Sequence, residues 1–327
     1  MSADTDEVVD RSKFLGGSDV AAVLGISPWR TPLELAREKR KPRTQTDDTK
    51  GSRGQVLSRG KRWESVVAEM LVESMKERGY TLDILQWNMR YTDPEHPFLA
   101  AEIDAEGLLS GGEVSDWPHR VEVNIELKTV HPFKVKEWGL SEDGAGLSDQ
   151  IPMWYAAQVQ HGMMVRGRNL CVVGALVGAD YLMPYIVPRD DEIIGWLRPA
   201  LVRFWQDCVL GGIDPDAINI DDVRRLYKPE LDGIEISDEV QESYLRLIAC
   251  KREIKAREAE IELHEFRLAK FMGKHQVLLD AEGKELVTFK EQSGAYLDYD
   301  KLKAEYPDAQ KKCSAKWTKR ILKAKGV

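Results

Sequence analysis

The chain has 327 residues, of which 43% are hydrophobic and 31% charged, and its formal net charge is -8. This size predicts one large domain with an appendage. The acidic total excludes a protein that coats DNA with a uniformly basic surface, although local positive charge around a channel stays compatible with it. No apolar run is long enough to cross a bilayer and there is no signal peptide, so we expect a cytoplasmic protein without membrane contact.

Cysteine usage argues against two kinds of metal centre. The four cysteines are far apart in the sequence and form no Cys-x-x-Cys motif; they are Cys171, Cys208, Cys250 and Cys313. Neither a zinc site nor an iron–sulfur cluster is therefore supported.

The first motif surrounds Ser18, which follows Gly16 and Gly17 and precedes a short apolar segment. This pattern predicts a short helix with the Ser18 hydroxyl at its N-cap. A glycine-flanked helix start also binds phosphate in many proteins, and the sequence is equally consistent with a plain capped helix. The Thr-Pro-Leu-Glu stretch at residues 31–34 is a capping box that predicts a helix over residues 32–40 with a folding role only.

A longer helix is predicted over residues 55–77, because apolar side chains recur there at helical spacing. Glu64 lies at the edge of this apolar stripe. A glutamate in such a place is most often simply solvated.

Two neighbouring segments carry acidic residues on predicted strands. Residues 121–130 alternate apolar and polar side chains, so Glu126 and Lys128 share one face. The run from residue 98 to residue 109 is a second strand that carries Asp104. Two carboxylates and a lysine that meet at one point can hold Mg²⁺ and orient a water, which is the equipment for cutting a phosphodiester. A Glu-x-Lys pair by itself is usually a solvated charge pair.

The block at residues 149–163 predicts a helix in which Tyr155 and Gln158, three positions apart, share a face. Neutral side chains of this kind hydrogen-bond phosphate or base edges without competing for a metal. A buried network between helix and sheet is the alternative. Strands at residues 170–178 and 181–187 and an amphipathic helix at residues 190–210 complete an α/β core.

The C-terminal part differs in character. An acidic linker is predicted up to about residue 236, followed by a helix over residues 237–272 with an apolar residue at every seventh position, which is too narrow a seam for a free-standing coiled coil. We expect its stripe to pack against the core or a neighbouring subunit. Residues 276–290 predict a hairpin, and the basic stretch from Lys311 with Trp317 is either a DNA or partner contact or a solvated helix. The predicted domains are a nuclease core (1–212), a linker (213–236) and a helical extension with a β-hairpin (237–327).

Four blocks in the same order resemble the lambda-exonuclease/YqaJ branch of the PD-(D/E)xK nuclease superfamily, the viral recombination exonucleases. They are residues 11–29, residues 59–64, the set Asp104, Glu126 and Lys128, and residues 149–163. The resemblance covers about the first 210 residues. Ile103 stands where the superfamily's name has proline, and the metal acid that follows it is kept.

This resemblance implies a restriction-endonuclease-like α/β core with a central mixed sheet flanked by helices. It further implies a Mg²⁺-dependent exonuclease, with Mn²⁺ as a substitute, that digests linear double-stranded DNA from 5′ to 3′ in the host bacterial cytoplasm and leaves 3′ single strands for phage-type recombination. The implied partners are DNA ends, two further copies in a homotrimer ring, and a single-strand-annealing protein.

The resemblance also assigns roles to individual residues. The implied metal and catalytic set is Asp104, Glu126, Lys128 and Glu64, with the Leu127 carbonyl as a further metal ligand. The implied 5′-phosphate and DNA-binding set is Arg11, Ser18, Tyr155, Gln158 and Gln160. Two other functions stay open: a structure-specific or site-specific endonuclease that uses the same metal site, and a non-catalytic scaffold that binds DNA ends.

Overall fold

The computed structural model describes residues 10–41, 52–111, 120–139, 147–230, 233–316 and 318–324, with residues 52–61 described by their backbone alone. The chain divides into two compact units, Met1–Leu226 and Tyr227–Val327. The division falls inside the segment predicted as a linker, residues 213–236. Within the described ranges, no helix is both long enough and apolar enough to span a membrane.

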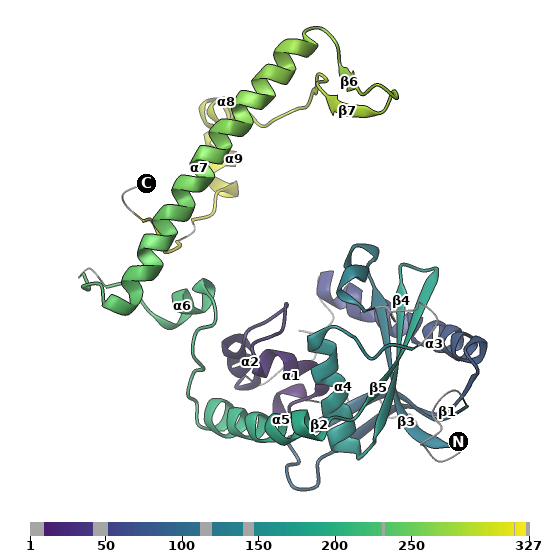
Figure 1. Cartoon of the computed structure of the whole chain (residues 1–327). Coiled ribbons are helices and arrows are strands. Elements are labelled where there is room, and N and C mark those ends of the chain that lie inside the picture. The colour runs from purple at the N-terminus through teal and green to yellow at the C-terminus, as the bar shows by residue number, and fades with distance from the viewer. Residues whose placement is uncertain are drawn as a thin grey trace. The chain divides into compact units, whose positions relative to one another are not determined.

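The first unit is built around a five-stranded mixed sheet (Figure 1). The strands lie in chain order: β1 Tyr80–Thr92, β2 Ala100–Gly111, β3 Val121–Val130, β4 Leu170–Val177 and β5 Tyr181–Pro188. All neighbours are antiparallel except β3 and β4, which run parallel. Parallel neighbours need a crossover, and helix α4 supplies it. The predicted mixed sheet is confirmed.

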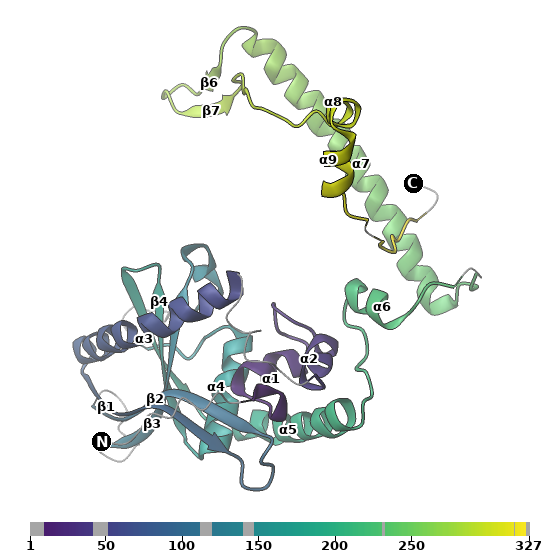
Figure 2. The same ribbon diagram turned by 180° about the vertical axis from the view of Figure 1, so that it is seen from behind.

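Helices cover both faces of this sheet, as the two opposite views show (Figures 1 and 2). The helices of the unit are η1 Arg11–Lys13, α1 Gly17–Val23, α2 Pro32–Lys39, α3 Ser52–Glu77, η2 Pro132–Glu137, α4 Met153–Arg166, α5 Asp191–Arg203, η3 Phe204–Leu210 and α6 Ile220–Leu226. Leu71 of α3 shares a core cluster with Ile125, whereas Met163 of α4 shares another with Val173. Side chains on both faces of the central strands are therefore buried, which is typical of a parallel pair.

Local sequence explains where the helices begin and end. Thr31 caps α2 and forms the predicted capping box with Glu34. Gly167 ends α4 with a φ of 74°, a left-handed conformation that glycine adopts without strain. The single helix predicted over residues 190–210 is α5 followed by the π-helical turns of η3, where the Gly211 N–H donates to the Gln206 carbonyl over 2.8 Å. The five-residue spacing of that bond defines the π-helix, and the apolar pattern alone does not distinguish it from an α-helix.

The stretch from residue 214 to residue 226 is bound to α2. Asp214 accepts hydrogen bonds from Arg37 and Arg40 at 2.6 and 2.7 Å, and the buried Asp222 accepts one from Thr31 Oγ1 at 2.9 Å. The first part of the predicted linker is thus held by charge-assisted contacts to the core.

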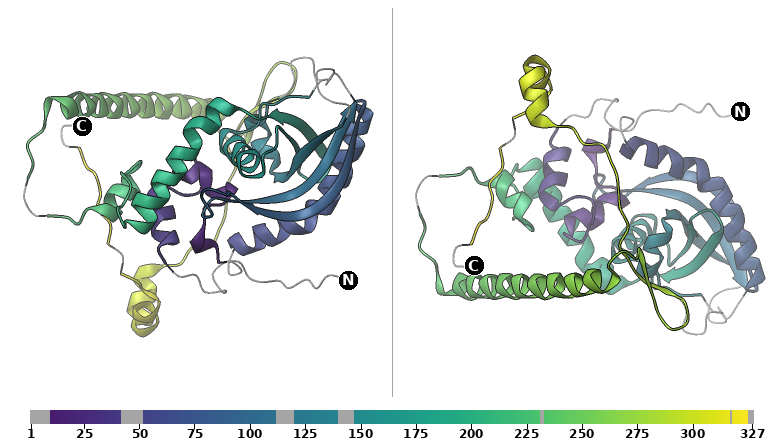
Figure 3. Two further views of the ribbon diagram at one scale, coloured as in Figure 1. Left: turned by 90° about the horizontal axis from the view of Figure 1, so that it is seen from below. Right: turned by 90° about the horizontal axis from the view of Figure 1, so that it is seen from above.

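The second unit contains one long helix and smaller elements. They are α7 Asp238–Met272, β6 Val277–Leu279, β7 Glu285–Thr288, α8 Tyr299–Glu305 and α9 Pro307–Cys313. Figure 3 shows α7 as one continuous helix, and β6 and β7 form the predicted hairpin. Ile254 and Ile261 of the seven-residue repeat are 57% and 56% exposed within this unit. Trp317 lies outside the described residues.

Candidate active site

The acidic residues of β2 and β3 meet where these strands diverge. The two strands pair as far as Ala105 and Ile125. Beyond this point the Leu127 N–H donates a hydrogen bond to Asp104 Oδ2 at 2.8 Å, so the Asp104 carboxylate occupies a position beside β3. Lys128 Nζ donates to Glu126 Oε1. The structure therefore brings Asp104, Glu126 and Lys128 to one place.

Glu126 has an unusual electrostatic environment. Its side chain is buried, and burial is the main reason why its pKa rises to about 7; repulsion from Asp104 and Glu64 adds to this, against the attraction of Lys128. Glu64 of α3 thus adds to the negative potential at Glu126. A buried carboxylate that is crowded by two others is a place where a cation is stabilised.

Lys128 is protonated at neutral pH. Burial alone lowers its pKa, but Glu126 and Asp104 outweigh burial and raise the pKa above its ordinary value. The side chain acts in this state as a donor and a positive charge. Its Nζ also lies 5.3 Å from the centre of the Tyr155 ring, which is within cation–π range.

The donor set fits a hard divalent cation. Within the described part of the chain, no three His, Cys, Asp or Glu side chains are grouped so as to hold a metal by themselves. Mg²⁺ does not need such a group, because it commonly binds one or two carboxylates and takes its other ligands from water and phosphate. Asp104 and Glu126 supply two oxygen ligands, and the Leu127 backbone is fixed beside them by its bond to Asp104.

Helix α4 contributes one of its two predicted glutamines to this place. Gln158 Nε2 donates to Glu126 Oε1. Gln160 lies elsewhere: its Nε2 donates to the Pro188 carbonyl at 2.8 Å, and its Oε1 accepts from the Asp190 N–H at 2.9 Å. Residues two positions apart on a helix do not share a face. Gln160 therefore holds the β5–α5 connection and lies apart from the acidic cluster, and its predicted contact with DNA stays a prediction.

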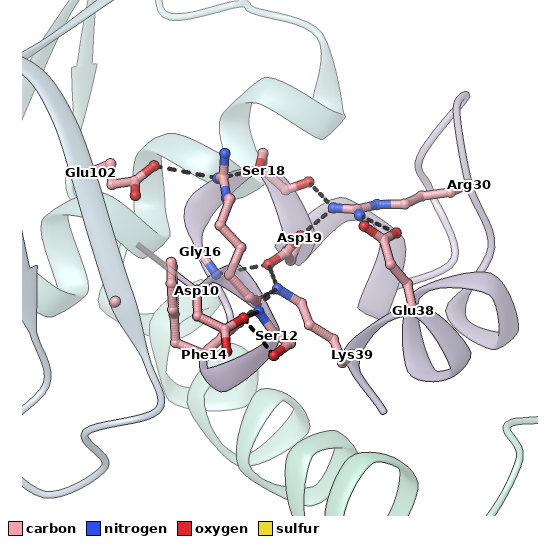
Figure 4. Close-up of polar contacts among 12 residues, drawn as sticks. Asp10, Ser12, Phe14, Gly16, Ser18, Asp19, Arg30, Glu38, Lys39 and Glu102 are labelled. Carbon is pink, nitrogen blue, oxygen red and sulfur yellow. Dashed lines mark hydrogen bonds and ion pairs between the residues drawn. The ribbon is translucent and has the colours of Figure 1, made fainter. Parts of the chain in front are cut away.

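A second cluster contains the predicted phosphate-binding pair (Figure 4). Arg11 Nη2 lies 3.3 Å from Ser18 Oγ and 3.3 Å from Glu102 Oε2. The Arg11 side chain is 37% exposed, so its guanidinium is open to solvent. Arginine and a hydroxyl are common phosphate ligands. Glu102 is the carboxylate that pairs with the Arg11 guanidinium in this structure.

A buried ion network supports this pair (Figure 4). Asp19 accepts from the Gly16 N–H at 2.9 Å and pairs with Arg30 and with Lys39, whose Nζ lies 2.7 Å away. Burial raises the pKa of Asp19, but the charges of Lys39 and Arg30 outweigh burial and hold it below its ordinary value. The helix cap is Gly16, and Asp19 closes the capping box, so the predicted N-cap role of Ser18 is wrong. The Ser18 hydroxyl is left available to Arg11.

A small cavity joins the two clusters. Its lining includes Gly17 and Glu102, the latter being the ion-pair partner of Arg11, and also Glu126, Gln158 and Asn124. The buried Asn124 amide has no hydrogen-bond partner in the part of the chain that the structure describes, so this cavity presents one unpaired polar group. A Cβ on Gly17 would lie 3.0 Å from Gln158 Cγ, which shows how closely α1 approaches α4 here.

Sequence reasoning did not identify four residues of these clusters: Asp19, Arg30, Lys39 and Glu102. Glu102 carried a usable signal, because it lies on the strand of Asp104, two residues earlier. Asp19 carried another, since its carboxylate lies three residues after the cap glycine. Arg30 and Lys39 gave none, because their pairing with Asp19 depends on how α1 packs against α2.

Comparison with known proteins gives matches over the first unit and over the whole chain. Residues 8–169 match the model of the YqaJ-like viral recombinase domain. The chain is 28% identical over 329 residues to the uncharacterized protein YqaJ of Bacillus subtilis (strain 168), covering 95% of this chain and 91% of that protein. Among solved structures, it is similar to an alkaline exonuclease (LHK-Exo) from Laribacter hongkongensis, at 16% identity and a TM-score of 0.40 over 62% of this chain and 90% of that one. It is also similar to a phage related exonuclease from Haemophilus somnus 129PT, at 14% identity and a TM-score of 0.29 over 61% and 96%.

Proposed function

Because residues 8–169 belong to the YqaJ-like viral recombinase family, we propose that this protein is a Mg²⁺-dependent exonuclease. It digests linear double-stranded DNA from the 5′ ends and leaves 3′ single strands for recombination by strand annealing. The observation that carries this proposal is one cavity lined both by Glu102, which pairs with Arg11, and by Glu126 of the acidic cluster. A terminal phosphate at Arg11 would lie next to the acids that act on the neighbouring phosphodiester.

The acidic cluster supplies the chemistry. Asp104, Glu126 and the Leu127 carbonyl, with Glu64 as a further acid, would hold Mg²⁺ or, in its place, Mn²⁺, and the cation would supply Lewis-acid polarisation of the scissile phosphate. The Lys128 ammonium orients the attacking water and offsets the negative charge that develops on the phosphate. Gln158 fixes the orientation of the Glu126 carboxylate.

The basic cluster sets the 5′-to-3′ direction of digestion. Arg11 and Ser18 hold the 5′-terminal phosphate, which displaces Glu102 from the guanidinium. The hydrogen bonds of Lys39 Nζ to the Arg11 and Phe14 carbonyls, at 2.6 and 2.7 Å, hold the backbone of this segment in place. Tyr155, whose ring centre lies 5.3 Å from Lys128 Nζ, positions the strand end.

The catalytic assignment is tested with linear 5′-phosphorylated duplex and supercoiled plasmid, each incubated with Mg²⁺. We expect digestion of the duplex alone; nicking of the plasmid indicates an endonuclease, and no change in either indicates a scaffold. Asp104→Ala and Glu126→Ala should each lower the rate at least about a hundredfold while DNA binding persists. Glu122→Ala is the matched control, because this residue is an exposed glutamate of the same strand. Near-normal activity of either acid variant removes the proposed metal site.

The polarity assignment is tested with Arg11→Ala on duplexes that carry 5′-phosphate or 5′-hydroxyl ends. A charge-assisted contact to phosphate predicts about ten- to hundredfold slower digestion of the phosphorylated ends, with little change for hydroxyl ends. Lys13→Ala, an 80% exposed cation of the same short helix, is the control. Equal slowing on both ends assigns Arg11 to folding or to general DNA affinity.

Assembly forms the last part of this proposal. Family membership supports a homotrimer ring that encloses DNA, and a single-strand-annealing protein as partner. Analytical ultracentrifugation of the full chain measures the first, and a monomeric mass at working concentration contradicts it. Co-purification with an annealing protein measures the second.

A further inference from the structure

Trp29 is a large aromatic side chain that the proposed mechanism does not use. It lies in the loop between α1 and α2, and 64% of its surface is exposed. We infer that Trp29 is a stacking platform for a nucleobase of the DNA strand that enters the active site. This inference rests on the proposed function and assigns a contact to a base, whereas the other assigned groups contact phosphate or metal.

A continuous set of ring contacts connects Trp29 to the acidic cluster. The centre of its ring lies 6.0 Å from that of Tyr155 and 6.1 Å from that of Trp154, the latter in an edge-to-face arrangement at 81°. The Tyr155 ring in turn lies 5.3 Å from Lys128 Nζ. The exposed indole is thus one aromatic ring away from the lysine beside the scissile phosphate.

The loop that carries Trp29 is anchored on both sides of the residue. The Trp29 backbone N–H donates to Ser27 Oγ at 3.2 Å. The next residue, Arg30, is 12% exposed and pairs with Asp19 and with Glu38, the latter at 3.0 Å (Figure 4). An aromatic ring on a fixed backbone loses little freedom when a flat partner stacks on it, which favours binding.

The same anchor leads to the proposed phosphate site. Arg30 Nη2 also donates to the Ser18 carbonyl at 3.3 Å (Figure 4). The residue after Trp29 is therefore bound to the proposed phosphate-binding residue. Trp29 is therefore linked to Ser18 through Arg30 and to Lys128 through Tyr155. A strand whose phosphates are held at both places exposes its bases in between, and stacking on an aromatic side chain accepts any of the four bases.

The protein side of the test uses binding of 5′-phosphorylated duplex in an Asp104→Asn background, which prevents digestion in the presence of Mg²⁺. Trp29→Ala should weaken binding about five- to a hundredfold, and Trp29→Phe should restore most of it. Trp196→Ala is the matched control, because Trp196 is 50% exposed on α5 and has no ring contact to this site. Far-ultraviolet circular dichroism of each variant verifies folding.

The DNA side of the test uses duplexes with one abasic position among the terminal nucleotides of either strand. At the position whose base stacks on Trp29, loss of that base should weaken binding to the Trp29 protein. It should leave binding to the Trp29→Ala protein unchanged, because that protein already lacks the stacking contact. The stacking role is overturned if Trp29→Ala lowers the affinity for the intact duplex and for every abasic duplex by the same factor. It is also overturned if Trp29→Ala binds the intact duplex as tightly as the Trp29 protein does. The indole is then available to another partner, such as a protein. Failure of the Trp29 protein to bind any duplex rejects the proposed function itself.

Discussion

Asp19→Asn removes the negative charge from the buried network that supports the phosphate-binding segment. The side chains of Asp19 and Lys39 are each 4% exposed, and that of Arg30 is 12% exposed. Asparagine keeps an oxygen for the Gly16 N–H, so the helix cap survives. The substitution therefore removes the ion-pair partner of the cations, chiefly that of the buried Lys39.

The structure gives the size of this loss. In the variant, the Lys39 ammonium keeps only neutral oxygen partners, including the Arg11 and Phe14 carbonyls. Breaking a buried ion pair by removing one partner costs about 3–5 kcal/mol, which is a large share of a typical unfolding free energy of about 5–15 kcal/mol. Adding Lys39→Met removes the uncompensated charge, at a cost of about 1 kcal/mol for each carbonyl that loses its donor. The double variant should thus be more stable than Asp19→Asn alone.

Urea unfolding of the full chain, followed by tryptophan fluorescence, measures these differences. Arg120→Ala is the control, because it breaks an exposed ion pair with Asp83 at 2.8 Å and should cost less than about 1 kcal/mol. The pKa of Asp19 lies below 3.8 in the folded protein, so its stabilisation is present above about pH 4 and is lost as the pH falls through the folded pKa. A cost no larger than that of Arg120→Ala, or losses that simply add in the double variant, would refute the reasoning.

Three further predictions concern the acidic cluster and α4. The Mg²⁺ affinity of the metal-free protein should rise between about pH 6 and 8 and then level off, because burial, with Asp104, raises the pKa of Glu126 to about 7 and the cation binds the carboxylate form. Titration calorimetry in two buffers of different ionisation enthalpy detects the protons released on binding. A Mg²⁺ affinity that does not change with pH in this range contradicts the prediction. Gln158→Ala should lower kcat about 10- to 100-fold, because this amide orients Glu126. Gln160→Ala should instead leave kcat unchanged and lower the unfolding free energy by about 1–3 kcal/mol, because two backbone groups lose their partner. Steady-state kinetics and urea unfolding measure the two quantities. A loss of kcat in Gln160→Ala together with an unchanged kcat in Gln158→Ala would contradict both assignments.

The elements that the sequence predicts are those whose apolar side chains recur with one period. The strand at residues 121–130 and the helix that begins after Ser237 follow this rule, and both are present. No such periodicity marks β1, which forms an edge of the sheet and has mostly exposed side chains. The register of β1 shifts between Ile84 and Gln86, and Asn88 has a φ of 52°. An edge strand with a bulge loses the alternation by which strands are recognised.

The family predicted from the four blocks is confirmed by the match over residues 8–169. Within the site, the sequence places Asp104, Glu126 and Lys128 on adjacent strands, because strand spacing is simple and antiparallel neighbours are common. It does not separate Gln158 from Gln160, since the choice between them needs the direction in which α4 faces the sheet. The pairing of Asp19 with Lys39 is similarly a property of packing between helices.

The acidic total of the chain and its proposed action on DNA are reconciled by how the site's cations are paired. Arg11 contacts Glu102, Lys128 contacts Glu126, and Arg30 contacts Asp19. Each positive charge is thus largely neutralised by a carboxylate of the same site, and the net charge of -8 says little about what these groups bind. Of the three pairs, only Arg11 and Glu102 are substantially exposed, at 37% and 44% of their side chains. An exposed pair is worth little by itself. A doubly charged terminal phosphate can therefore replace Glu102 at small cost, while the buried pairs keep the surrounding backbone in place.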